Sequence, residues 1–199
     1  MDKQTGMVYV FVGDGKGKTS AALGVALRTL LINKKVVWIS WFKSKDWNIS
    51  EMGLVRVFKK TLKMYWSGEG FFIKNGESKV RGPKIVKRAR TAISVVYDLT
   101  TPEKHKKAAK NALVFAKKIL SESGTCLVVL DEIIQAVNEE LITAKEVIDL
   151  LEGRGETHIV LTGHKCPASI ASKADLVTMM KKIKHPYDSG KLAVRGLDF

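Results

Sequence analysis

Apolar and polar residues follow a regular plan along this chain. Apolar runs of strand length occupy residues 7–12, 36–42, 126–130, 158–162 and 175–179, and residues 62–66 form a further candidate strand. Helical spacing of apolar residues marks the segments between them, at 18–31, 49–60, 101–121, 143–151 and 167–171. Continuous apolar runs are typical of strands covered on both faces. Their alternation with helices predicts an α/β fold, a mostly parallel sheet flanked by helices.

Local signals mark several helix ends. Thr101 and Pro102 suit the cap and first turn of a helix, and Thr143 with Glu146 has the signature of a capping box. Glycines are expected to end these two helical segments, at Gly124 and Gly153. The buried stripe of the 101–121 helix is predicted to contain Ala108, Ala109, Ala112, Leu113, Phe115, Ala116, Ile119 and Leu120.

The stretch from residue 45 to residue 101 is the hardest to interpret. Residues 67–73 have the composition of a loop that exposes Phe71 and Phe72, and residues 79–90 are strongly basic. A Ser/Gly/Pro-rich linker is absent, so we interpret this stretch as an elaborated edge of the sheet. Residues 1–199 are therefore expected to form a single domain.

The net charge of +14 comes almost entirely from the middle of the chain. Residues 43–118 carry 19 Lys and Arg against 6 Asp and Glu. Such an excess suits a nucleic-acid face, an electropositive wall around a polyphosphate, or solvated helix faces. Composition alone leaves these three interpretations open.

The sequence carries no signal for a membrane or for secretion. No apolar run reaches the roughly 18 residues of a membrane-spanning helix, and the first six residues lack the apolar core of a signal peptide. Cys126 and Cys166 have no Cys or His partner at metal-ligand spacing. We expect them to be reduced thiols in a cytoplasmic protein.

Residues 12–20 have the layout of a phosphate-binding loop between a strand and a helix. Glycines let backbone N–H groups turn toward an anion, and the helix N-terminus adds the positive end of its dipole. In such loops the lysine, here Lys18, reaches the phosphates, and the hydroxyl of Thr19 can bind Mg²⁺. We expect a nucleotide site made by Gly13, Asp14, Gly15, Lys16, Gly17, Lys18, Thr19 and Ser20.

This loop is one residue shorter than the standard pattern G-x-x-x-x-G-K-[ST]. Counting five residues back from Gly17 reaches Val12, and Gly13 stands only four back. We expect the loop to hold phosphates, in a pose that need not be the usual one.

Two acids directly follow the apolar run at residues 126–130. A carboxylate at the carboxyl end of a parallel strand faces the ligand edge of the sheet. Asp131 and Glu132 could therefore hold Mg²⁺ directly or through water, or could merely favour the N-terminus of the next helix. His164 follows another strand at this edge, where it has either a substrate contact or a structural role. We recognise no Ser/His/Asp set and no metal-ligand cluster in the sequence, and neither a finger arginine nor a Gln placed to orient water.

Together these motifs resemble the P-loop type of ATP:corrinoid adenosyltransferase, and the likeness covers nearly the whole chain. The matching segments are residues 13–19, 130–133, 161–163, 174–179, 183–190 and 196–198. The resemblance implies a RecA-like P-loop NTPase fold, usually a homodimer. It also implies Mg²⁺ as cofactor, ATP and a Co(I) corrinoid as substrates, and a flavoprotein as reductant.

The reaction implied by this resemblance moves the 5′-deoxyadenosyl group of ATP. Co(I) attacks C5′, the C5′–O bond breaks and the whole triphosphate leaves, so ATP must lie reversed relative to ordinary P-loop enzymes. We interpret the short loop as the cause of this reversed pose of ATP. Lys16, Lys18 and Glu132 are the expected catalytic residues, and Thr19, Asp131 and Glu132 are the expected metal ligands.

The resemblance further implies aromatic residues beside the corrinoid, which keep cobalt without its lower ligand and ease its reduction. Phe71 matches the family's Gly-Phe, with Phe72 beside it, but Ile73 stands where the family has Trp. His164 replaces an Arg of many members, and only six residues precede the first strand.

Two other functions fit the motifs. One is a P-loop ATPase or kinase, and the other is an ATP-regulated nucleic-acid-binding protein that uses the basic middle of the chain. The resemblance to the adenosyltransferases, in contrast, implies a role in adenosylcobalamin biosynthesis or salvage.

Overall fold

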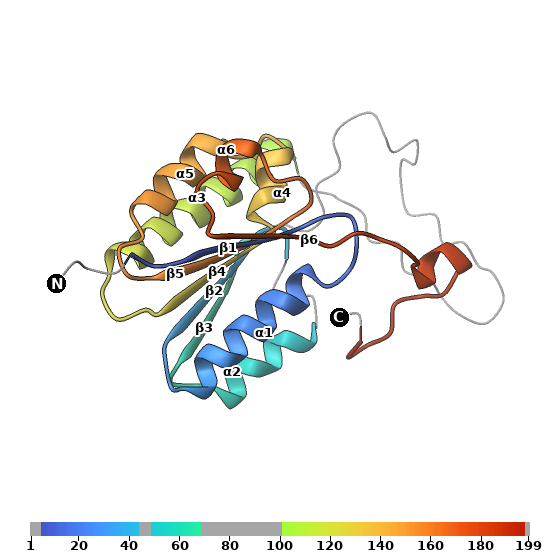
Figure 1. Ribbon diagram of the computed structural model, residues 1–199, viewed down its shortest axis with the longest axis horizontal. Coiled ribbons are helices and arrows are strands. Elements are labelled where there is room, and N and C mark those ends of the chain that lie inside the picture. The colour runs from blue at the N-terminus through green and yellow to red at the C-terminus, as the bar shows by residue number, and fades with distance from the viewer. Residues whose placement is uncertain (1–4, 44–48, 69–100, 198–199) are drawn as a thin grey trace.

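The computed structural model describes residues 5–43, 49–68 and 101–197. Six strands, all parallel, form one sheet in the order β3-β2-β4-β5-β1-β6 (Figure 1). The strands are β1 (Val8–Val12), β2 (Val36–Ser40), β3 (Leu62–Trp66), β4 (Leu127–Asp131), β5 (His158–Thr162) and β6 (Leu176–Met179). The predicted α/β fold with a parallel sheet is confirmed. The expected loop with Phe71 and Phe72 and the basic segment 79–90 lie outside the described residues.

Helices cover both faces of the sheet, as the apolar strands predict. The helical elements are α1 (Lys18–Leu31), η1 (Ser50–Gly53), α2 (Leu54–Val57), α3 (Pro102–Ser121), α4 (Ile133–Asn138), α5 (Ala144–Glu152), α6 (Ala168–Ala171) and η2 (Pro186–Ser189). α1 and α2 lie on one face, and α3 to α6 lie on the other (Figure 1). Each face has its own buried apolar cluster, which contains Trp38 and Leu30 on the α1 side and Trp41 and Ile134 on the opposite side. Burial of these side chains on both faces stabilises the sheet.

The predicted N-terminal helix caps are confirmed, and Gly153 is the C-cap of α5, but the C-cap of α3 is Glu122 and not Gly124. Thr101 accepts a hydrogen bond from the backbone N–H of Lys104, and Thr143 and Glu146 form a complete capping box. The buried stripe of α3 differs in detail from the prediction, because Ala108 and Phe115 are only half-buried and His105 takes a buried place.

Two predicted elements are shorter in the structure. The apolar run at 36–42 forms a strand only to Ser40, because Phe42 turns the chain with φ of 60°. The predicted 49–60 helix is a 3₁₀ turn followed by the single turn of α2, which ends where Phe58 leaves helical geometry. Both differences reflect local turns that hydrophobic spacing does not encode.

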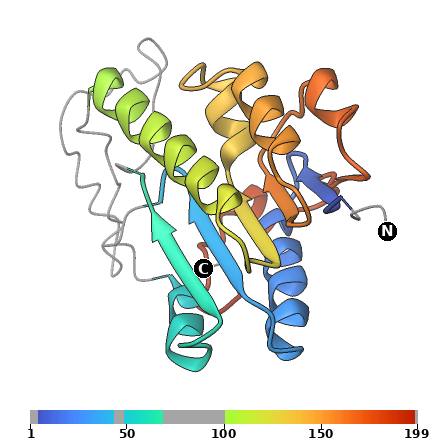
Figure 2. The ribbon, with the colours of Figure 1, turned by 90° about the vertical axis from the view of Figure 1, so that its left-hand side faces the viewer.

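The parallel strands bring their carboxyl ends to one edge of the sheet (Figure 2). The register places Ser40 of β2 opposite Asp131 of β4, and Phe11 of β1 opposite Thr162 of β5. Polar residues from strands distant in sequence therefore meet at this edge, which is where ligands bind in open α/β sheets.

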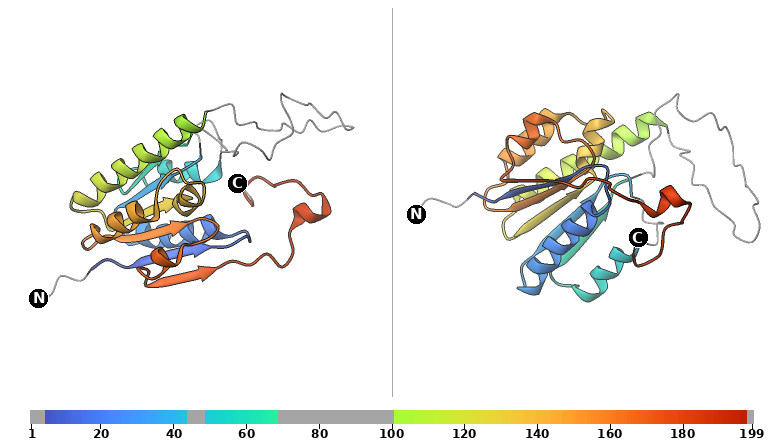
Figure 3. Two further views of the ribbon diagram at one scale, coloured as in Figure 1. Left: turned by 90° about the horizontal axis from the view of Figure 1, so that it is seen from above. Right: turned by 45° about the vertical axis from the view of Figure 1, so that its right-hand side comes forward.

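The chain beyond β6 runs away from the sheet and then returns. It forms η2 and turns back toward α1 (Figures 1 and 3). Gly196 and Leu197 line a cavity together with residues of α1. Within the described residues, no helix is long and apolar enough to cross a membrane.

We predict that Gly163→Ala destabilises the fold by about 1–3 kcal/mol. Gly163 has φ of 155°, and a Cβ there would lie 2.6 Å from Ile134 Cβ and 2.7 Å from the backbone nitrogen of Gln135. Chemical unfolding measures this loss. Gly24→Ala in α1 is the matched control, because its Cβ would meet no atom within 4 Å. The control should gain about 0.5–1 kcal/mol. Equal stability changes in the two variants would contradict the packing at Gly163.

Candidate nucleotide and metal site

The predicted phosphate loop lies between the ends of β5 and β6. Gly13 N–H donates to the carbonyl of His164, and Gly15 N–H donates to the carbonyl of Met180, both at 2.8 Å. Gly13 has φ of 121°, and a Cβ there would lie 2.3 Å from the Met180 carbonyl oxygen. Only glycine fits this close approach without strain.

Asp14 ties the tip of the loop to the C-terminal segment. Its exposed carboxylate accepts a hydrogen bond from the backbone N–H of Lys182 at 3.1 Å. That hydrogen bond is the main cause that lowers the pKa of Asp14. The segment beyond β6 therefore supports the loop as well as the sheet.

Lys18 begins α1 and folds back over the loop. Its ammonium group donates to the carbonyl oxygen of Gly15 at 2.9 Å, while Gly17 precedes it as the N-cap of the helix. Lys16 on the loop and Ser20 in the first turn of α1 are both exposed. The loop residues thus surround the N-terminus of α1, whose dipole favours an anion.

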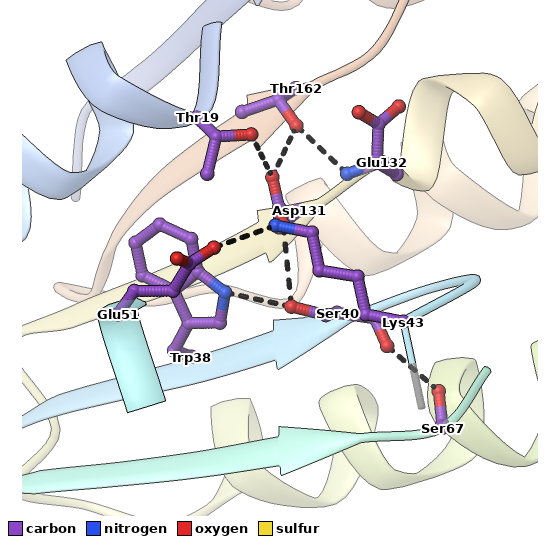
Figure 4. A network of polar contacts seen from close by, with 9 residues as sticks. All are labelled: Thr19, Trp38, Ser40, Lys43, Glu51, Ser67, Asp131, Glu132 and Thr162. Carbon is purple, nitrogen blue, oxygen red and sulfur yellow. Dashed lines mark hydrogen bonds and ion pairs between the residues drawn. The ribbon is translucent and has the colours of Figure 1, made fainter. Parts of the chain in front are cut away.

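Asp131 is the centre of a polar network at the edge of the sheet (Figure 4). Its Oδ1 accepts hydrogen bonds from the hydroxyls of Thr19 at 3.1 Å and Thr162 at 2.9 Å. Its Oδ2 accepts from Ser40 at 3.3 Å and lies 2.8 Å from the ammonium of Lys43. The carboxylate is fully buried. It therefore joins α1, β2, β4 and β5.

Lys43 bridges Asp131 to a second carboxylate. Its ammonium lies 3.1 Å from Oε1 of Glu51 in η1, and the two side chains are 15% and 9% exposed. Burial lowers the pKa of Lys43, but the charges and hydrogen bonds of Asp131 and Glu51 outweigh it and raise that pKa. Lys43 therefore stays cationic.

Glu132 has a different environment from its neighbour. It takes a left-handed backbone with φ of 65°, and its N–H donates to the Thr162 hydroxyl at 2.8 Å. Burial, and then the negative charge of Asp131, raise the pKa of Glu132 to about 7, against the opposing charges of Lys18 and Lys43. This carboxyl group can therefore exchange a proton near neutral pH.

His164 lies close enough to the loop to respond to its charge. Burial, and then the positive charge of Lys18, lower the pKa of His164. Its backbone carbonyl holds Gly13, as described above. His164 therefore has a structural role, because its backbone carbonyl holds the phosphate-binding loop in place.

The donor set at Thr19 and Asp131 suits Mg²⁺. A hydroxyl oxygen and a carboxylate oxygen lie 3.1 Å apart, and both are hard ligands. Within the described residues, no three His, Cys, Asp or Glu side chains form a group that could hold a metal. This agrees with the usual habit of Mg²⁺, which takes one or two protein ligands and completes its shell with phosphates and water.

A cavity of about 600 Å³ adjoins this network, between α1 and the η1–α2 segment. Its lining includes Thr19, Ser20, Leu23, Lys43, Glu51 and Leu197. Polar groups of the network thus lie beside apolar walls, a combination common in ligand sites.

The structure brings some of the sequence-predicted site residues into contact, and it places further residues in the same site. Thr19 and Asp131, distant in sequence, are in contact, and Lys18 is near enough to Glu132 to affect its pKa. Lys43 directly follows the apolar run at 36–42 and was not assigned to the site from the sequence. Ser40 and Glu51 were missed entirely. In the sequence, these two residues are marked only by their position near the ends of predicted elements. That position points to the site only when the order of the strands in the sheet is known.

Fold and site together define the class of the protein: an α/β protein with the parallel sheet of RecA-like P-loop domains. Residues 4–199 match the family model of the ATP:corrinoid adenosyltransferase BtuR/CobO/CobP. The chain therefore belongs to the ATP:corrinoid adenosyltransferase family, which is a family of enzymes.

Curated relatives agree with this assignment over nearly their full length. A corrinoid adenosyltransferase of Escherichia coli K12 is 29% identical over 197 residues, 98% of this chain and 87% of the relative. The corrinoid adenosyltransferase CobA of Salmonella typhimurium is 29% identical over 99% of this chain and 87% of its own length. A Pseudomonas aeruginosa corrinoid adenosyltransferase is 27% identical over 98% and 85%.

We predict that the stability gain from Glu132→Gln depends on pH. The pKa of Glu132 is about 7 in the fold and 4.5 without it, so the folded state binds the proton more tightly. The charged carboxylate therefore costs stability, increasingly as pH rises from about 4.5 to about 7, and fully above that range. Relative to wild type, the variant should gain about 1–3 kcal/mol between pH 4.5 and pH 8. Urea unfolding with a chelator present measures it. A difference that does not change with pH would contradict the raised pKa.

Proposed function

We propose that this enzyme transfers the 5′-deoxyadenosyl group of Mg–ATP to the cobalt of a Co(I) corrinoid and releases triphosphate. The observation that carries the proposal is the hydrogen bond between Thr19 and Asp131, which joins the phosphate loop to a strand-end carboxylate. Family membership supports the corrinoid as acceptor.

The reaction needs charge stabilisation more than proton transfer. Co(I) supplies the electron pair of the new Co–C5′ bond and becomes formally Co(III). The C5′–O bond breaks, and its electron pair leaves with triphosphate. Because no proton is removed from the nucleophile, the enzyme has to orient C5′ and neutralise the charge that grows on the leaving group.

The loop residues are the proposed triphosphate ligands. Lys16, Lys18 and the backbone N–H groups of residues 13–20 would bind the phosphate oxygens, once the ammonium of Lys18 leaves the carbonyl of Gly15. Each hydrogen bond to a charged group contributes roughly 1.5–3 kcal/mol. These contacts favour departure of triphosphate as a whole.

Thr19 and Asp131 would hold Mg²⁺, with Glu132 beside them. Bound there, Mg²⁺ supplies positive charge to the leaving triphosphate. Glu132 is the proposed third ligand of Mg²⁺ because it directly follows Asp131, and the charge of Asp131 affects its pKa.

The corrinoid half of the site is proposed from sequence. Phe71 and Phe72 would lie beside the corrinoid and exclude the lower cobalt ligand. We further propose a single catalytic domain, a homodimer and a flavoprotein that reduces Co(II). The unpaired thiols of Cys126 and Cys166 support a cytoplasmic location.

Lys18→Ala is expected to lower the rate of adenosyl transfer at least a hundredfold. The loss of even one strong charge-assisted bond, near 3 kcal/mol, corresponds to about that factor. The rate is followed by the disappearance of the Co(I) spectrum with Mg–ATP, and thermal unfolding checks the fold. Lys145→Ala is the control, because Lys145 is 83% exposed on α5. A rate of Lys18→Ala within about tenfold of wild type, or roughly 1.4 kcal/mol, would remove Lys18 from the site.

Phe71→Ala is expected to impair turnover from Co(II) more than turnover from pre-reduced Co(I). An aromatic residue that excludes the lower ligand acts on the reduction and not on the transfer itself. Parallel assays with a Co(II) corrinoid plus reductant and with chemically reduced Co(I) measure the two losses. Equal losses would exclude this role for Phe71.

A further inference from the structure

Lys43 reaches the network through a strained turn. Its backbone N–H donates to the carbonyl of Trp41 at 2.6 Å around Phe42, whose φ of 60° is that of the rare γ-turn. Trp41 N–H in turn donates to the backbone carbonyl of Asp131 at 2.9 Å. Strained backbone persists where the surrounding structure fixes it, and it is concentrated at functional sites. Here the turn directs the Lys43 side chain back over the Asp131 carboxylate.

The four donors to Asp131 differ in their freedom to leave. Ser40 and Thr162 are fully buried on strands, and each has a second hydrogen bond, from the indole of Trp38 and from the N–H of Glu132. The ammonium of Lys43 is instead at the end of a long, flexible side chain, and Lys43 lines the 600 Å³ cavity. The Lys43 ammonium can therefore withdraw toward a ligand, while the strand hydroxyls stay in place.

A buried carboxylate needs a cation, and two cations compete for Asp131. Without a metal, Lys43 at 2.8 Å supplies the positive charge that makes burial of Asp131 tolerable. A divalent ion arriving at Thr19 and Asp131 meets the repulsion of this ammonium. A polyphosphate arriving with the ion gives the ammonium a new anionic partner. Lys43 thus disfavours the metal alone and favours the metal together with phosphates.

We propose that Lys43 is a resident counter-ion of Asp131 that makes metal binding dependent on polyphosphate, and that it moves to the phosphates when both bind. The inference rests on the proposed function, because it takes Asp131 as a metal ligand. It adds Lys43 to the groups that contact the leaving triphosphate. Glu51 guides this movement, because it holds the ammonium at the cavity wall 3.1 Å from its own carboxylate.

The test compares wild type with Lys43→Met, which keeps the length of the side chain and removes its charge. Calorimetry measures binding of Mn²⁺ alone, of inorganic triphosphate with EDTA, and of Mn²⁺ at saturating triphosphate. The variant should bind Mn²⁺ alone at least tenfold more tightly and metal-free triphosphate at least tenfold more weakly. The factor by which triphosphate improves Mn²⁺ binding should fall at least tenfold. Lys145→Met on exposed α5 is the control and should change none of these values.

A merely structural Lys43 gives a different result. Weaker or unchanged Mn²⁺ binding in a folded Lys43→Met variant would overturn the proposed role. Failure of wild type to bind Mn²⁺ with triphosphate would instead overturn the proposed function, and the role of Lys43 with it. The two failures are thus told apart by the wild-type measurement.

A measurement on wild type covers the case in which Lys43→Met does not fold. Amine labelling of Lys43, quantified by mass spectrometry, reports whether the ammonium is engaged. Saturating Mn²⁺ alone should increase the labelling rate at Lys43 at least threefold, and Mn²⁺ with triphosphate should return it to or below the starting rate. A rate at Lys43 that does not respond to Mn²⁺ would overturn the proposal.

Discussion

The charge of one buried carboxylate constrains the edge of the sheet. Asp131 has no exposed surface, so its negative charge must be met by donors inside the protein. Hydroxyls from α1, β2 and β5 and the ammonium of Lys43 supply them. The same contacts fix the relative positions of the phosphate loop and three strands. Stability and the proposed chemistry therefore depend on the same group.

The local sequence predicted most of the framework. Continuous apolar runs identified β1, β2, β4 and β5 because both faces of the sheet are covered there. Thr143 with Glu146 identified a helix start because a capping box is a short-range interaction. The end of β2 was not predictable in this way. Phe42 turns the chain directly after Trp41, whose N–H donates to the backbone carbonyl of Asp131, and that partner lies far along the sequence.

The candidate site was predicted only in part, for the same reason. Thr19 and Asp131 belong to motifs that can be recognised one at a time. Ser40, Lys43 and Glu51 join them only because β2 lies beside β4 in the folded sheet. The raised pKa of Glu132 likewise depends mainly on burial, which the fold creates, and not only on the charge of its sequence neighbour Asp131. Long-range pairing is thus what turns separate motifs into one electrostatic unit.

The central claim is that the phosphate loop holds a triphosphate that leaves intact. The most direct measurement is the phosphate product after incubation with Mg–ATP and a chemically reduced corrinoid. We expect one triphosphate for each adenosylated corrinoid, with loss of the Co(I) spectrum. ADP and phosphate formed without consumption of the corrinoid would contradict it.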